Sequence, residues 1–259
     1  MKLLKVLKKD LKSPYQDFQF EIGKEYHCEN FDTSDEECSR GFYATDIDGL
    51  PYAYNIHRKV YECEVSGKSR EFDIYKRRYE NMKLIREVTR KELVKLAKPR
   101  DKILGYKLSE VINPINPLLI QRGDITDKEL ELLKQWDSVM DSVTGSVWGS
   151  VWDSVTDSVW GSVRGSVLDS VTDSVWGSVL DSVTDSVWDS VRDSMFGYIS
   201  SLFPNIENWK YIQHKKGVNP FRCGINLWKS GLVPSYDGMT WRLHSGTDAK
   251  VVYEERRIK

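Results

Sequence analysis

The sequence predicts an α+β protein in three parts: an α+β N-terminal domain, a central β-solenoid built from four-residue repeats, and a small α+β C-terminal cap. Two observations carry this prediction. Serine stands at every fourth position from Ser138 to Ser194, and valine follows it from Val139 to Val191. On either side of this tract, short runs alternate apolar and polar residues, which is typical of half-buried strands.

The repeat, residues 136–197, has three candidate conformations. In a continuous α-helix, a step of four residues rotates the stripe of valines by about 40° per repeat, so no single face would stay buried. Disorder is disfavoured because valine and tryptophan are frequent in the tract. Since both residues favour strands, while Asp, Gly and Ser suit tight corners, we favour a β-solenoid with valine inside.

The residue before each serine indicates how many sides a coil would have. Read from Asp137 in groups of four repeats, this position runs DDGG, DDGG, DDGD, DDDG, a period of sixteen residues. That period favours a four-sided coil. A period of twelve aligns Thr172 with Thr184 and Trp176 with Trp188, which keeps a three-sided coil as the alternative. Four coils stacked at strand spacing would give a rod of about 19 Å.

Residues 1–98 are expected to form the N-terminal α+β domain. Apolar and polar residues alternate in several short runs, and Gly67 between two of them suggests a hairpin turn. Arg90–Leu96 has the pattern of a short helix that Pro99 ends. The expected strands are Leu3–Leu7, Phe18–Ile22, Val60–Val65, Glu71–Ile74 and Lys83–Val88.

The remaining segments are expected to link and cap the solenoid. Residues 99–125 are interpreted as a linker broken by prolines, and residues 126–135 as a helix that covers one solenoid end. Thr126 and Glu129 have the spacing of a capping box. Residues 198–259 form the predicted C-terminal cap, which contains a helix in Pro220–Ser230, a turn at Pro234–Gly238, and paired strands at Thr240–His244 and Lys250–Glu254.

Two parts of the sequence resemble segments of phage and phage-like bacterial proteins. Phe18–Tyr26 and Cys38–Tyr54 resemble an uncharacterised N-terminal domain, over residues 1–95, that often precedes pentapeptide or other short repeats. Residues 198–255, which contain NPFRCGINLWKSGLVPSYDGMTWRLHSG, resemble the tail that follows such repeats. The resemblance implies a phage-type repeat protein but no established activity.

A shorter segment, Arg40–Thr45, resembles part of the ADP-ribosyltransferase-like folds. That resemblance implies a tyrosine that stacks on nicotinamide, with Tyr43 and Tyr54 as candidates. It also implies an acidic residue that positions the ribose, with Glu62 and Glu64 as candidates. The alternative is that the aromatic residues of the segment belong to the core and its glycine makes a turn.

Charge is unevenly distributed along the chain. Residues 136–199 contain ten Asp and two Arg, a balance of −8, whereas the net charge is −1, so the flanking parts are basic. An acidic solenoid would line up carboxylates for a partner, and its tryptophans would add aromatic anchors. The alternative is that the aspartates only protect strand edges from aggregation. The predicted binding residues are Asp137, Asp141, Asp153, Asp157, Asp169, Asp173, Asp185, Asp189, Trp148, Trp160, Trp176 and Trp188.

No catalytic or cofactor motif was found in the sequence. It has no Gly-rich phosphate loop, no GxSxG elbow and no HExxH. Its four cysteines form no CxxC pair, so neither a metal site nor a cofactor is expected. Lysines interrupt the apolar run of the first twelve residues, which argues against a signal peptide or a membrane span, and a reduced, cytoplasmic protein is expected.

Three functions are compatible with these patterns. The favoured one is a non-enzymatic phage-type interaction protein whose acidic solenoid binds a host protein, with mimicry of DNA as one form of that binding. No direct binding of nucleic acid by the repeat and no membrane contact are expected, and a solenoid end is a candidate contact between two copies. The alternatives are an ADP-ribosyltransferase-like enzyme in the N-terminal domain and a structural spacer.

Overall fold

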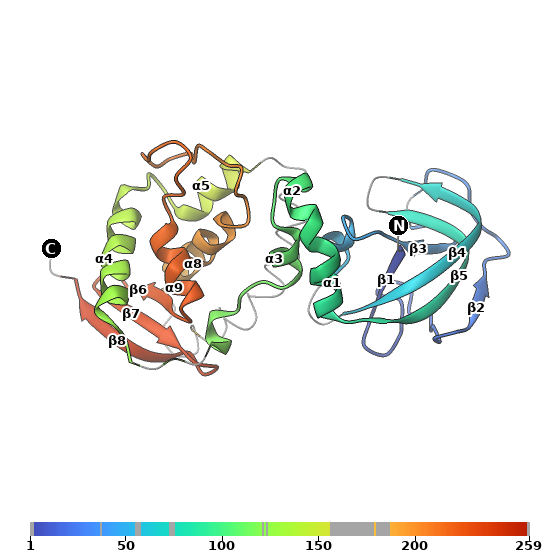
Figure 1. The fold of residues 1–259 in the computed structure, drawn as a ribbon, viewed down its shortest axis with the longest axis horizontal. Helices are drawn as coiled ribbons and strands as arrows, with labels where there is room; N and C mark the ends of the chain where they lie inside the picture. Colours follow the sequence, from blue (N-terminus) through green and yellow to red (C-terminus); the bar gives the residue numbers. More distant parts are fainter. Residues whose placement is uncertain are drawn as a thin grey trace.

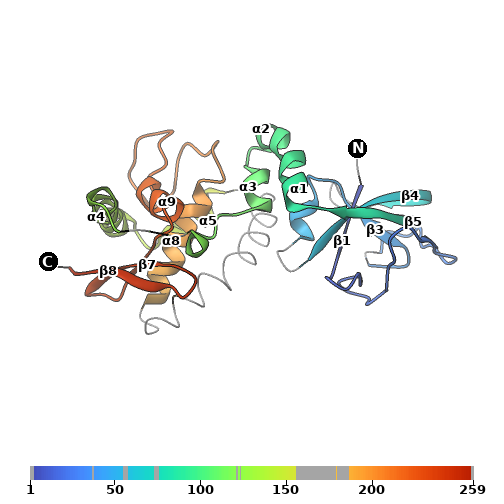
Figure 2. The ribbon, with the colours of Figure 1, turned by 60° about the horizontal axis from the view of Figure 1, so that its bottom comes forward.

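The computed structural model contains two antiparallel sheets and a set of helices. The two sheets lie at opposite ends of the molecule, and α1 (Arg90–Ala97), α2 (Asp101–Leu104) and α3 (Leu108–Ile112) lie between them (Figures 1 and 2). None of the helices in the described part of the chain combines the length and apolar character that crossing a membrane requires. The described residues are 3–36, 38–54, 58–72, 76–120, 122, 124–155, 179 and 187–257.

The strands of the N-terminal sheet close into a ring. β1 (Leu3–Leu7) pairs with β4 (Lys59–Glu71), and β4 pairs with β5 (Arg77–Val88). β5 in turn pairs with both β2 (Glu25–His27) and β3 (Phe42–Ala44). Just beyond β3, Thr45 exchanges both main-chain hydrogen bonds with Leu4 of β1, at N···O distances of 2.8 and 3.0 Å. We call the ring of β1, β4, β5 and β3 the N-terminal barrel.

Side chains of β1 alternate between the interior of the N-terminal barrel and the main core of the protein, as the period of a strand requires. On β1, Leu3 and Leu7 pack inside, whereas Leu4 and Val6 pack on the main core. Lys5 lies two residues from both Leu3 and Leu7, so it faces the interior as well. The buried interior cluster is Leu7, Phe20, Ala44, Tyr61, Cys63, Met82 and Leu84.

The structure confirms most of the predicted N-terminal elements and corrects the hairpin. The strands at Leu3–Leu7 and Lys83–Val88 are confirmed, as is the helix at 90–96. Gly67 does not form the hairpin turn: it lies inside β4 with a φ of 78°, where the pairing with β5 is irregular. The positive φ of Gly67 allows a bulge in the strand, and β4 continues beyond it to Glu71. Phe18–Ile22 contributes isolated bridges rather than a strand.

The described part of the repeat is helical, and the predicted β-solenoid, whether four-sided or three-sided, is wrong. α4 (Asp127–Ser142) and α5 (Val147–Ser154) contain its first repeats, and α8 (Trp188–Ser200) contains its last. No solenoid coil is present within the described ranges. The repeat residues 156–178 and 180–186 lie outside the described residues.

The described helices of the repeat are short, so the valines of each helix stay close to one face despite the drift of about 40° per repeat. α5 spans only two repeats, so Val147 and Val151 are offset by about 40° and both remain buried. α4 ends at Ser142, its C-cap residue Val143 has an extended conformation (φ −77°, ψ 121°), and Gly145 follows with a φ of 103°. The break lets the next helix start with its own valine facing inward.

Two serines of α8 pack against neighbouring elements instead of forming corners. Ser194 of α8 is fully buried and accepts a hydrogen bond from Trp228 Nε1 at 3.2 Å. Ser190, one turn earlier, accepts a hydrogen bond from the main-chain N–H of Tyr236 at 2.7 Å. Because serine is small, the helix approaches its neighbours closely, and its hydroxyl satisfies a polar group there.

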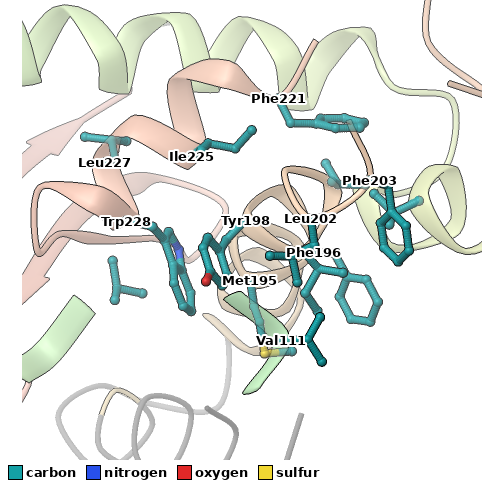
Figure 3. Close-up of a cluster of buried hydrophobic side chains, with 14 of the residues drawn as sticks. Val111, Met195, Phe196, Tyr198, Leu202, Phe203, Phe221, Ile225, Leu227 and Trp228 are labelled. Carbon is teal, nitrogen blue, oxygen red and sulfur yellow. The ribbon is translucent and has the colours of Figure 1, made fainter. Parts of the chain in front are cut away.

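The C-terminal segment packs against these helices. α9 (Arg222–Lys229) precedes a sheet of β6 (Val233–Tyr236), β7 (Thr240–Ser245) and β8 (Lys250–Arg256), in that order. The predicted helix and the pair of strands are confirmed. The turn predicted at Pro234–Gly238 starts later than expected, because Pro234 lies in β6 and the chain turns only after Tyr236. Tyr198 of α8 stacks on Trp228 with ring centroids 5.4 Å apart, among buried apolar side chains (Figure 3).

Trp136 of α4, the first residue of the repeat, is fully buried against α8 and α9. Two helical glycines provide the room for its indole ring. A Cβ added at Gly224 would lie 2.7 Å from the ring, and one at Gly197 would lie 3.0 Å from it. Helix α4 begins with the predicted capping box, in which the main-chain N–H of Thr126 donates to Glu129 Oε2 at 2.9 Å.

Residues 98–119 contain several short helices. These connect the N-terminal barrel to α4 and pack around the main core. Besides α2 and α3, they include the 3-10 helices η2 (Lys98–Arg100) and η3 (Pro117–Leu119), and a further 3-10 helix, η1 (Leu50–Tyr52), follows β3.

Candidate functional site

A cavity of about 570 Å³ opens at the N-terminal barrel. Its walls come from β1, β3 and the segment 13–20, and they are largely apolar and aromatic. The volume falls within the range of about 300–1,000 Å³ that is usual for small-molecule sites, and the mouth of a barrel is a common place for one. The aromatic residues that line it are Tyr15, Phe18, Phe20, Phe42, Tyr43 and Tyr52.

One wall of the cavity is a packed group of aromatic rings. Phe18 contacts Phe20 and Phe42 edge-on, with ring centroids 4.8 and 5.6 Å apart. Tyr26 of β2 lies 5.3 Å from both Phe18 and Phe20. Edge-to-face contacts of this kind hold each ring in one orientation, so the wall is formed before any ligand arrives.

The charged side chains that line the cavity are all cationic in the described part of the chain. Lys5 is buried in the interior, whereas Arg58 and Lys76 are half-buried and Arg40 is exposed. Lys5 Nζ donates a hydrogen bond to the main-chain oxygen of Tyr43 at 2.7 Å. Burial lowers the pKa of Lys5 to about 8. The electrostatic potential of the cavity therefore favours an anion.

The loop before β3, which carries the cavity residues Cys38, Arg40 and Gly41, is held in place by Arg78. This arginine is fully buried on β5, and its guanidinium donates to the main-chain oxygens of Ser34 at 2.8 Å and Glu36 at 2.9 Å. The chain passes so close that a Cβ at Gly41 would lie 2.6 Å from Arg78 Cγ. Arg78 thus fixes one wall of the cavity without lining it.

The structure separates the residues suggested by the ADP-ribosyltransferase resemblance. Tyr43 lines the cavity, but Tyr54 is buried in the main core, where its hydroxyl accepts a hydrogen bond from Arg90 Nε at 3.3 Å. Glu62 pairs with Arg86 at 3.2 Å, and Glu64 lies exposed on β4. Neither glutamate lines the cavity.

The described aspartates of the predicted binding face lie on three helices, and each has a partner within the chain. On α4, Asp137 accepts a hydrogen bond from Trp241 Nε1 at 2.8 Å, and both Asp137 and Asp141 pair with Arg257. On α5, Asp153 accepts a hydrogen bond at 2.6 Å from the hydroxyl of Tyr211. On α8, Asp189 pairs with Arg192 at 2.8 Å.

The tryptophans of that face are only partly accessible. Trp148 is 37% exposed and contacts Trp152 and Phe196, and Trp188 is 45% exposed. The remaining predicted binding residues lie outside the described residues: Asp157, Asp169, Asp173, Asp185, Trp160 and Trp176.

A serine–histidine pair in the C-terminal sheet has a structural rather than a catalytic environment. Ser235 Oγ lies 2.7 Å from His244 Nε2, and His244 Nδ1 lies 3.0 Å from the main-chain oxygen of Ala249. Both side chains are fully buried, so a substrate has no access to the serine. Burial lowers the pKa of His244, which favours the neutral ring that this pairing requires.

Lys5 is the site residue that the sequence interpretation missed. Its signal was present: in Leu3–Leu7 a lysine occupies the middle of the face that Leu3 and Leu7 define. Within the described residues, no group of three or more His, Cys, Asp or Glu side chains is arranged to hold a metal ion.

Comparison with known proteins finds a similarity in the N-terminal part of the chain. Residues 1–96, which include the N-terminal barrel and most of α1, match the family model described as "Domain of unknown function (DUF7666)". No curated protein and no solved structure matches the chain. The similarity therefore coincides with the part of the chain that contains the cavity.

Proposed function

We propose that the protein is a binding protein whose N-terminal barrel takes a small molecule with an apolar, planar body. The observation that carries this proposal is the cavity of about 570 Å³ with aromatic walls. Edge-to-face packing and the Arg78 contacts keep these walls in place, so little ordering is needed when a ligand enters.

Binding of N-phenylnaphthylamine, an uncharged aromatic dye that fluoresces in apolar surroundings, tests the proposal. The wild-type protein should give a saturable signal with one dye per chain. Ala53→Trp, which places an indole at the wall of the cavity, should lower the affinity by roughly tenfold or more. Met239→Trp, at an exposed position of the C-terminal segment, is the control. An unsaturable signal, or equal affinity in both variants, would contradict the proposal.

A second candidate is the ADP-ribosyltransferase-like enzyme, and the position of Tyr43 on the cavity wall supports it. The described lining contains no carboxylate to position a ribose, so the support is limited to binding. Incubation with labelled NAD and a bacterial lysate tests this candidate. Label should pass to protein with the wild type and not with Tyr43→Ala.

Contact of the repeat with a host protein is a separate proposal, with a cytoplasmic location. The partly exposed Trp148 and Trp188 support it as aromatic anchors, and the four cysteines, which are free, suit a reducing compartment. The described aspartates support it less, since each has a partner within the chain. A pull-down from host lysate with the wild type and with a Trp148→Ala, Trp188→Ala double variant tests it.

A further inference from the structure

The position of Lys5 is costly unless something compensates for its charge. Its side chain faces the interior of the N-terminal barrel, and the residue is only 8% exposed. Neighbouring interior positions on the same strand are leucines, so a lysine there gives up favourable burial. A buried ammonium without a counter-ion also loses its hydration.

The described surroundings of Lys5 supply no counter-ion. Its ammonium lies 5.4 Å from the ring centre of Phe20 and donates to the main-chain oxygen of Tyr43. The ionisable group whose charge would act on Lys5 is the thiol of Cys63, and burial raises the pKa of that thiol to about 12, so it stays neutral. An ammonium has three N–H donors, and the structure gives one hydrogen bond to a described residue.

We propose that the ligand of the N-terminal barrel carries an anionic group (a carboxylate, sulfonate or phosphate) and that this group pairs with Lys5 inside the cavity. The proposal rests on the binding function proposed above and adds the ligand's charge and orientation. A charge-assisted hydrogen bond to Lys5 would supply the missing counter-ion, while the aromatic wall covers the apolar body.

Arg58 and Arg40 are better placed to guide a ligand than to hold its charge. Arg58 donates to the main-chain oxygen of Ala53 at 2.6 Å, and its guanidinium lies 5.5 Å from the ring centre of Tyr15. Arg40 is exposed. Charges near the surface are screened by salt, and they accelerate encounter more than they add affinity.

The proposal also makes binding dependent on pH. The pKa of Lys5 in the empty cavity is lowered to about 8, so affinity for an anion should fall as the pH rises beyond that value. Other titratable groups face the same cavity from β2, β3 and the loops, so the wild-type profile alone is insufficient. The comparison with a Lys5 variant isolates its contribution from those of His27, Cys28, Cys38, Lys76, Tyr15, Tyr43 and Tyr52.

Two dyes that share one ring system test the proposal on the full chain. Anilinonaphthalene sulfonate is anionic, and N-phenylnaphthylamine has the same rings without the sulfonate. Affinities for both would be measured with the wild type, Lys5→Met and the control Lys83→Met, which lies on β5 outside the cavity lining. Methionine keeps the length of the lysine stem and suits an apolar interior, and circular dichroism would verify folding.

We expect Lys5→Met to weaken sulfonate binding by roughly tenfold or more and to leave binding of the neutral dye within about threefold, while Lys83→Met changes neither. Wild-type affinity for the sulfonate alone should decline between pH 7 and pH 9.5, and Lys5→Gln, which also removes the charge, should flatten that decline and replaces Lys5→Met if that variant fails to fold. Equal effects on both dyes, or unchanged sulfonate binding, would overturn the role of Lys5 only. Failure of the wild type to bind either dye would overturn the binding function as well.

Discussion

Asp193 of α8 accepts a hydrogen bond from the main-chain N–H of Trp148, in the first turn of α5, at 3.0 Å. The carboxylate is only 3% exposed, and it joins two helices of the repeat that are distant in the sequence. Its environment contains opposing influences: burial favours the protonated acid, while the N-terminus of α5 and Arg192 favour the anion. Burial dominates and raises the pKa of Asp193 to about 6.

The first prediction concerns stability against pH. Between about pH 4 and pH 6, the native state retains a proton at Asp193 that the unfolded chain has lost, so the free energy of unfolding should fall as the pH rises. The full effect is about 3 kcal/mol. Asp193→Asn should remove this slope, whereas Asp189→Asn, on the exposed side of the same helix, should keep it. Urea unfolding at pH 4, 5, 6 and 7 measures the free energy of unfolding of the wild type and of both variants. If that free energy changed with pH in the same way in the wild type and in Asp193→Asn, the prediction would be refuted.

The second prediction tests the packing of Trp136 with matched helical glycines. Gly224→Ala puts a methyl group against the buried indole and should lower the free energy of unfolding by about 1–3 kcal/mol. In Gly149→Ala, the added Cβ would lie 3.4 Å from its nearest neighbour, Ser146 Oγ, which is an ordinary contact. The gain in helix propensity should make this change neutral or stabilising. Thermal and urea unfolding measure the stability of both variants. If Trp136 did not pack against α9, the two substitutions would have similar effects.

The third prediction compares two serines of the repeat that make the same local bond. The hydroxyls of Ser194 and Ser142 each donate a hydrogen bond to the main-chain oxygen three residues earlier, at 2.8 Å. Ser194 is buried, and it also accepts a hydrogen bond from the indole N–H of Trp228. Ser194→Ala leaves that N–H unsatisfied and should cost about 1–3 kcal/mol. Ser142→Ala, at an exposed site, should change stability by less than about 0.5 kcal/mol. Similar costs at the two sites would argue against helical packing of the tract.

The fourth prediction concerns the wall that Arg78 holds. Arg78→Lys keeps the charge but cannot reach both carbonyls with a planar fork, so the loop at 34–41 should loosen. Amide hydrogen exchange in that loop should accelerate, and affinity for N-phenylnaphthylamine should fall several-fold. Arg86→Lys, which changes a partly exposed ion pair on the same strand, is the control. Exchange rates that stay unchanged in Arg78→Lys would show that the loop is held by other contacts.

The sequence was a good guide wherever local chemistry decided the structure. The capping box at Thr126, the strand at Leu3–Leu7 and the strands at Thr240–His244 and Lys250–Glu254 were all predictable. The repeat was not, because the drift of about 40° applies only to one continuous helix. Val143, which caps the end of α4, and Val147, where α5 begins, are the same residue at the same motif position, so the pattern of serines and valines does not reveal the break.

The candidate site was accessible from the sequence only in part. Tyr43 was singled out, but from a short resemblance that also suggested Tyr54, which is in the main core. The cavity depends on the bridge between Leu4 and Thr45, which closes the barrel across forty-one positions of the chain, and pairing over such distances has no local signal. Lys5 was visible as a break in an apolar face, although only the closed barrel makes that face an interior.

The packing of α5 against α8 has a consequence for the copies of the repeat. α5 and α8 contain an early and a late part of the repeat, and they pack directly against each other. The hydrogen bond from the main-chain N–H of Trp148 to Asp193 joins them. The two repeats that meet there contribute differently, although both have serine at the same motif position. Gly149 occupies in α5 the motif position that Asp193 occupies in α8, so replacing the later copy by the earlier one would remove the carboxylate from this contact. Copies of the tetrapeptide that look interchangeable in the sequence are therefore not interchangeable in the structure.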